Sequence, residues 1–64
     1  MNFFIWLLTW RHDFGPRAAM VHALIDAEVS ANTPDEVRAA AAAAGLHRGH
    51  LNALEQAIAE WNAL

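Results

Sequence analysis

Apolar residues recur at helical spacing in four segments of the chain, and no segment shows the strict alternation of a β-strand. The first segment covers residues 2–10, with Asn2 as a favourable N-cap residue, and is apolar on most sides. The second begins at Pro16 or Arg17, since proline suits the first helical position, and ends near Ser30. Its predicted buried face consists of Met20, Val21, Leu24, Ile25 and Val29, and its opposite face of Ala18, His22, Asp26 and Ser30.

The third and fourth predicted helices have clear boundary signals. Thr33-Pro34-Asp35-Glu36 is a capping box with proline at the first helical position, and Gly45 is a suitable left-handed stop. Between them lie the successive alanines 39–44, which we interpret as a closely approached packing surface on which the first helix lies. The fourth helix begins near Arg48 or Gly49 and continues to the last residue. Its apolar stripe consists of Leu51, Leu54, Ile58 and Trp61.

These segments predict an all-α protein, a compact single-domain bundle over residues 1–64 with four or five short helices. The chain contains no cysteine, so neither a disulfide nor a thiolate metal site can hold it together. A chain this short must then rely on efficient helix packing. The apolar run of residues 3–8 is shorter than the roughly 20 residues that cross a membrane. We therefore expect a monomer in the bacterial cytoplasm that does not contact a membrane.

Two parts of the sequence resemble one known family. The chain opens with Asn2-Phe3-Phe4-Ile5-Trp6-Leu7-Leu8-Thr9, and its closing pattern after Gly45 is Leu51-x-x-Leu54-Glu55-x-Ala57-x-x-Glu60-Trp61. Both are similar to the YozE-like group of small bacterial proteins, which open with Ser-Phe-Tyr-x-Trp/Tyr-Leu-Leu and have a sterile-alpha-motif-like fold. The chain departs from the group at Ile58, where the group has tryptophan, and at Asn32-Thr33-Pro34, which replaces Phe-Pro. The resemblance implies a bundle of four or five helices that serves protein contacts, and it implies no catalytic residue.

Side chains suited to catalysis or metal binding are few, since the chain has no cysteine, lysine or tyrosine. Its hydroxyl groups are those of Thr9, Ser30 and Thr33. His47 and His50 are three residues apart, but a zinc site requires three or four ligands. His12 and Asp13 are adjacent without a nucleophile beside them. We expect no enzyme, no catalytic residue, no cofactor and no metal site, and the alternative is a zinc protein centred on His47 and His50.

The net charge of the chain is more informative. Seven acids against four arginines give −3, which disfavours direct binding to nucleic acid. The charge is uneven, because residues 1–25 sum to +1 and residues 26–64 to −4. We interpret the acids as a patch that binds a basic, nucleic-acid-binding surface of a partner protein, and the alternative is a solvated face that serves solubility. The candidate patch consists of Asp26, Glu28, Asp35, Glu36, Glu55 and Glu60.

Aromatic residues crowd into residues 3–14 at the start of the chain. Most of them are needed in the core of so small a bundle, because large side chains offset the entropy of ordering. We expect Phe4, Trp10 and Phe14 to remain partly exposed, since this region has more apolar faces than one core can cover. Trp10 and Phe14 are therefore a second candidate site for a protein partner.

Two functional hypotheses follow from charge and resemblance. The first is a small acidic, non-catalytic inhibitor from a phage or mobile element of a GC-rich bacterium. Arginine in place of lysine and the abundance of alanine are what a GC-rich genome would encode. Its most specific form is an anti-CRISPR-like protein that blocks the nucleic-acid-binding surface of a CRISPR effector subunit. The second is a YozE-like host module that mediates a regulatory contact or self-association through Trp10 or Phe14. Charge reversal of Glu28 or Asp35 is expected to abolish binding in the first case only.

Overall fold

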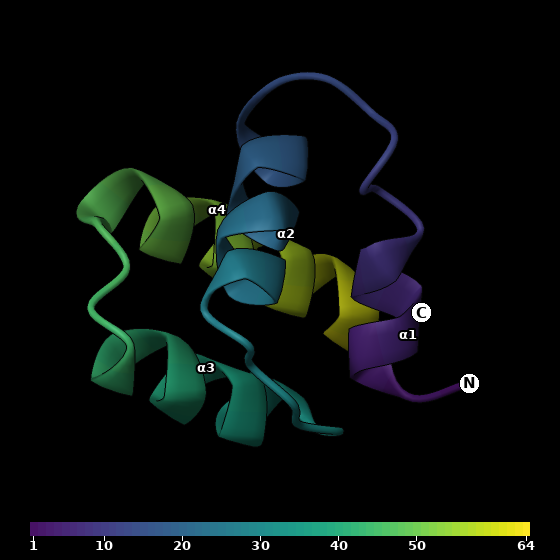
Figure 1. Ribbon diagram of the computed structural model, residues 1–64. Coiled ribbons are helices and arrows are strands. Elements are labelled where there is room, and N and C mark those ends of the chain that lie inside the picture. The colour runs from purple at the N-terminus through teal and green to yellow at the C-terminus, as the bar shows by residue number, and fades with distance from the viewer.

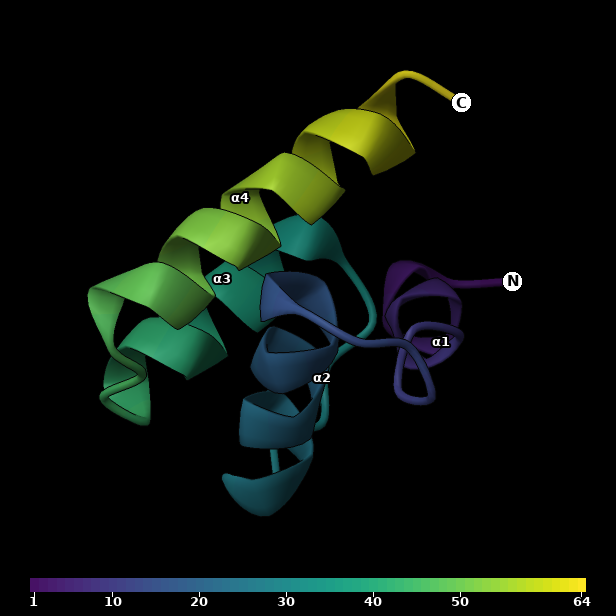
Figure 2. The ribbon, with the colours of Figure 1, turned by 90° about the horizontal axis from the view of Figure 1, so that it is seen from above.

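The computed structural model describes residues 1–64 and consists of four helices without a strand, which confirms the predicted all-α class. The helices are α1 (Phe3–Leu8), α2 (Pro16–Asp26), α3 (Pro34–Ala43) and α4 (Arg48–Asn62). The long α4 packs against α2 and α3, and α1 contacts α3 (Figure 1). Seen from above in Figure 2, α4 runs along one side of the molecule, and α1 lies at the end away from the α3–α4 connection. No helix is long and apolar enough to cross a membrane.

All four helices contribute to one hydrophobic core, and no polar or charged side chain is buried in it. Within each helix the buried residues recur every three or four positions, in places as adjacent pairs, so each helix presents one face to the others. Because the chain has no disulfide, this packing holds the fold together. The largest fully buried side chains are those of Phe3, Leu7, Met20, Val21, Leu24, Val37 and Leu54.

The first helix begins as predicted but ends sooner. The Asn2 side chain accepts a hydrogen bond from the Ile5 backbone N–H at 2.9 Å, which confirms the N-cap. The helix ends at Leu8, so the prediction that it continues to Trp10 is wrong. The Thr9 hydroxyl donates to the Trp6 carbonyl at 2.7 Å, and the backbone N–H groups of residues 9–11 donate to carbonyls three residues back. These local bonds replace the regular helical ladder.

The second helix also ends early, at Asp26 rather than near Ser30. Glu28 adopts a positive φ of 57°. The backbone N–H groups of Glu28 and Val29 both donate to carbonyls of the last turn at 3.0 Å, which is the Schellman arrangement. This arrangement usually has glycine at the left-handed position, so a sequence with glutamate there gives no stop signal.

The burial predicted for two residues of α2 is wrong. Ala18, predicted on the polar face, is only 4% exposed, whereas Ile25, predicted in the core, is 41% exposed. The buried face is centred on Val21 and Leu24, and both Ala18 and Ile25 lie near its margins at 100° per residue. A short side chain is covered there by its neighbours, while a long one reaches solvent.

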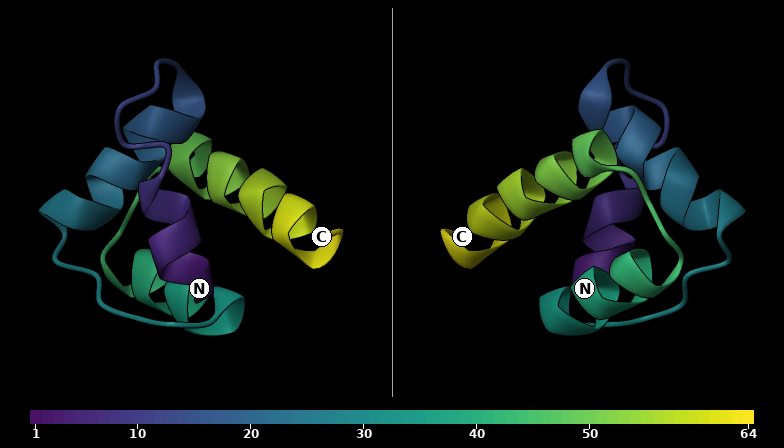
Figure 3. Two further views of the ribbon diagram at one scale, coloured as in Figure 1. Left: turned by 90° about the vertical axis from the view of Figure 1, so that its right-hand side faces the viewer. Right: turned by 90° about the vertical axis from the view of Figure 1, so that its left-hand side faces the viewer.

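The alanine-rich helix α3 packs through a narrow face. Only Val37 and Ala41, one turn apart, are fully buried in this helix. The prediction that the whole run 39–44 forms a packing surface is therefore wrong, because α3 lies at the edge of the bundle and most of the run faces solvent. The predicted stop is confirmed, since Gly45 follows the helix with φ 77°. Figure 3 shows α1 standing over α3, as expected.

The fourth helix agrees with its predicted stripe. It begins at Arg48, and its Leu54 and Ile58 side chains are buried while Leu51 and Trp61 are half-buried. The small residues Ala53 and Ala57 also reach the core, so the buried face is wider than the stripe of large residues. Trp61, near the end of α4, joins the aromatic side chains of Phe3 and Trp6 in α1.

Candidate protein-interaction surface

The six candidate carboxylates do not share one environment, and Glu60 is the first of four cases. It forms an ion pair with Arg17, which also donates a second hydrogen bond to it at 3.0 Å. The pair connects the start of α2 to the last turns of α4. The hydrogen bond from Arg17 lowers the pKa of the Glu60 carboxyl from its ordinary value. The negative charge of Glu60 is thus balanced by Arg17 within the molecule.

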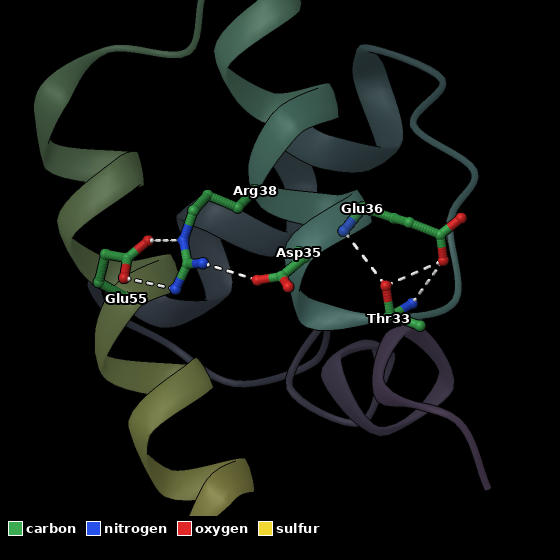
Figure 4. Close-up of polar contacts among 5 residues, drawn as sticks. All are labelled: Thr33, Asp35, Glu36, Arg38 and Glu55. Atoms are coloured by element: carbon green, nitrogen blue, oxygen red, sulfur yellow. Dashed lines mark hydrogen bonds and ion pairs between the residues drawn. The ribbon is translucent and has the colours of Figure 1, made fainter.

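Asp35 and Glu55 are brought together by one arginine. The Arg38 guanidinium donates from Nε and Nη2 to the two Glu55 oxygens at 2.7 and 3.0 Å, and from Nη1 to Asp35 at 2.9 Å (Figure 4). The two-point contact with Glu55 joins α3 to α4 and lowers the pKa of the Glu55 carboxyl through hydrogen bonding. Asp35 and Glu55 therefore serve a contact between helices, an arrangement that their separation in the sequence does not reveal.

Glu36 belongs to the capping box at the start of α3. Its backbone N–H donates to the Thr33 hydroxyl oxygen at 3.2 Å, and its carboxylate accepts from the Thr33 N–H at 3.2 Å (Figure 4). The same carboxylate accepts from the Thr33 hydroxyl at 2.9 Å. The predicted capping box is confirmed, and one carboxylate oxygen of Glu36 is engaged in it.

Asp26 and Glu28 form the fourth case, which we call the α2 acidic end. Both side chains are exposed, and neither makes a hydrogen bond or an ion pair. The extended connection that follows carries the chain away to the start of α3, so this end is separated from the other candidate acids (Figure 3). Of the six candidate carboxylates, these two have no partner inside the molecule.

Trp10 belongs to an aromatic cluster formed with Phe3, Trp6 and Trp61. Its ring meets Trp6 nearly edge-on, with 4.3 Å between ring centres, and the Arg17 guanidinium lies 5.0 Å from the centre of the Trp10 ring. Trp61 of α4 closes the cluster, with its ring centre 5.3 Å from that of Trp6. Trp10 is half-buried and joins α1 to α2 through its contacts with Trp6 and Arg17, so most of its surface serves the fold.

Phe14 is in a different situation from Trp10, because its surface is 98% exposed. It lies in the turn between α1 and α2, which His22 of α2 braces through one contact. The His22 ring Nε2 lies 2.7 Å from the Arg11 carbonyl oxygen, and Gly15 takes a positive φ of 90° before the helix begins. A large aromatic side chain is thus held in solvent by an ordered segment.

The histidine pair at the start of α4 has a structural role that was not predicted. His47 is the N-cap of α4, since its Nδ1 accepts from the backbone N–H groups of Gly49 and His50 at 3.0 and 3.4 Å. The two imidazole rings stack with 3.7 Å between their centres. Histidine is not among the preferred N-cap residues, so the only signal in the sequence was its position before the helix.

The surface has no pocket, and no three His, Cys, Asp or Glu side chains gather where they could hold a metal ion. Comparisons with protein-family models, curated proteins and solved structures find no match to the chain. The resemblance of its two ends to the YozE-like group stays a prediction.

Proposed function

We propose that this protein acts without catalysis, by binding a basic surface of another protein through the α2 acidic end. The observation that carries this proposal is that Asp26 and Glu28 have no partner inside the molecule. The other candidate acids are held by Arg17, by Arg38 or by the capping box. Carboxylates that are already free and exposed can meet arginine or lysine of a partner without first breaking an internal contact.

The local cost of these two acids supports the same proposal. Both lie at the C-terminal end of α2, where negative charge opposes the helix dipole. Glu28 in addition occupies the left-handed region, which costs a residue with a side chain about 1–2 kcal/mol. No contact within the protein offsets this cost for either acid. A contact with a partner protein would offset it, which supports a binding role.

The specific form that we propose is an anti-CRISPR-like inhibitor. A protein with a net charge of −3 is attracted to the positively charged groove in which another protein holds nucleic acid. An acidic end seated in such a groove of a CRISPR effector subunit would exclude the nucleic acid from it. Because the attraction is between charges, the association should weaken as salt is added.

Capture of partners by tagged protein tests this proposal if matched variants are compared. Lysate from a GC-rich bacterium with CRISPR systems is applied at low and moderate salt to wild type and to the double variant Asp26→Asn/Glu28→Gln. The control, Asp35→Asn/Glu60→Gln, changes the net charge equally. We expect a nucleic-acid-binding protein on wild type and control at low salt and its absence from the first variant. Equal recovery on both variants would reject the α2 acidic end as the binding site.

A second candidate function is self-association as an interaction module, and the exposure of Phe14 favours it. A fully exposed aromatic ring on a braced turn is typical of a contact residue. In this case the mass measured by sedimentation rises with protein concentration, and Phe14→Ala removes the rise while Asp26→Asn does not. A mass that stays that of one chain at all concentrations excludes this candidate.

A further inference from the structure

The N-cap of α4 depends on the protonation state of one imidazole. The backbone N–H groups of Gly49 and His50 can only donate, and both donate to Nδ1 of His47. Nδ1 must therefore carry a lone pair, so the ring is neutral with its hydrogen on Nε2. A protonated His47 has no acceptor to offer, and the cap cannot form.

The ring of His47 is held in the capping position from two sides. A Cβ atom added at Gly49 would lie 2.9 Å from Cε1 of His47, so glycine leaves the space that the ring occupies. The His50 ring stacks on the other side with 3.7 Å between ring centres and 29° between planes. The cap is therefore an ordered arrangement of three residues and more than a chance contact of an exposed side chain.

No acid offsets a positive charge at this point. The first turn of α4 contains Arg48 and no acidic residue, and the helix dipole is positive there. The neighbouring α3 ends in alanines and brings no charged group to the junction. Of the charged groups of α2, Arg17 is paired with Glu60, His22 contacts the Arg11 carbonyl, and Asp26 ends the helix.

The pKa of His50 is consistent with this environment. Burial, and then the charge of His47, lower the pKa of the His50 ring from its ordinary value. A ring whose folded-state pKa is lowered stabilises the fold above its ordinary pKa, and this stabilisation is lost as the pH falls through the lowered value. Both histidines therefore act in the same direction, toward a looser helix start in acid.

We propose that the first turn of α4 is a pH-sensitive latch, which is closed by neutral His47 and opens when His47 is protonated. The turn Arg48, Gly49 and His50 contributes no fully buried side chain, and the buried residues of α4 begin at Ala53. The turn can thus open while the hydrophobic core stays packed. This latch does not depend on the partner proposed for the α2 acidic end.

Amide hydrogen exchange tests the latch residue by residue. Protection factors of Gly49 and His50, corrected for the intrinsic effect of pH, are measured on the full chain at about pH 7.5 and about pH 5.5, on either side of the ordinary histidine pKa. We expect them to fall about fivefold in acid, which is the usual effect of losing an N-cap. Protection at Leu54 in the core should stay unchanged, because the opening is local.

Two variants separate the latch from a general effect of acid. His47→Ser keeps a hydroxyl cap that does not titrate, so its protection factors should fall much less in acid than those of wild type, with only the contribution of His50 remaining. His12→Ser removes a histidine that makes no hydrogen bond, and it should keep the fall seen in wild type. The proposal is overturned if the wild-type values do not change with pH or if His47→Ser shows the same fall.

Discussion

The C-terminal ends of α2 and α3 have the same backbone arrangement and different residues at its centre. Each helix is followed by a residue with positive φ. The backbone N–H groups of this residue and of the one after it donate to carbonyls of the last helical turn. After α3 this residue is Gly45, which takes the conformation at little cost, whereas after α2 it is Glu28. The comparison indicates that the stop of α3 favours stability. The stop of α2, by contrast, places an exposed acid in a backbone conformation that glutamate disfavours.

The largest expected effect on the free energy of unfolding is at Gly45, after α3. Gly45→Ala should lower the free energy of unfolding by about 1–2 kcal/mol, since a Cβ is disfavoured at positive φ. The space around Gly45 is open, so no steric contact adds to this value. Glu28→Ala is the matched change, and it should leave the stability nearly unaltered because Glu28 already has a Cβ. Urea unfolding of both variants measures the difference, and equal losses would contradict the comparison.

The next effect is a gain in the free energy of unfolding at Glu28, after α2. Glu28→Gly should raise the free energy of unfolding by about 0.5–1 kcal/mol, because relief of the left-handed strain exceeds the added entropy of the unfolded chain. It also removes a negative charge from the C-terminal end of α2. Thermal unfolding measures the change, with Glu28→Gln as the control for charge alone. A lower unfolding temperature for Glu28→Gly would show that the glutamate side chain stabilises the fold.

The smallest effect concerns acids that do serve the fold. Arg38 lowers the pKa of Glu55, so the pair stabilises the folded state above the ordinary glutamate value of 4.5 and loses this stabilisation as the pH falls through the lowered value. Arg38→Gln should remove this part of the acid sensitivity and cause only a small loss at neutral pH, because the pair is exposed. The measurement is urea unfolding at neutral pH and at a pH below the ordinary glutamate pKa. Arg48→Gln, which removes an arginine that pairs with no acid, is the control.

Much of the fold could be predicted because local chemistry determined it. The Asn2 cap, the Thr33 capping box and the Gly45 stop are each encoded within four residues, and the structure has all three. The end of α2 could not be predicted, since Glu28 gives no stop signal. The exposure of most of the alanine run depends on how α3 lies against the bundle, which no local pattern in the sequence contains.

The candidate site was less predictable than the fold. The contact of Arg38 with Glu55 joins residues that are 17 positions apart, so only the packing of α3 on α4 could reveal it. The same holds for Arg17 and Glu60, and for the partnership of Trp10 with the end of α4 through Trp6. Counting charges along the sequence finds every acid, but it cannot separate those with internal partners from those without.

The affinity of the captured partner for wild type and for Glu28→Gly, measured at two salt concentrations, tests the central claim most directly. The claim is that the α2 acidic end binds a basic partner and lowers the stability of the fold instead of raising it. The predicted result is an affinity about tenfold weaker for the variant and a smaller response to salt, in a protein that unfolds at higher urea concentration than wild type. An unchanged affinity, or weaker binding together with lower stability, would contradict the claim.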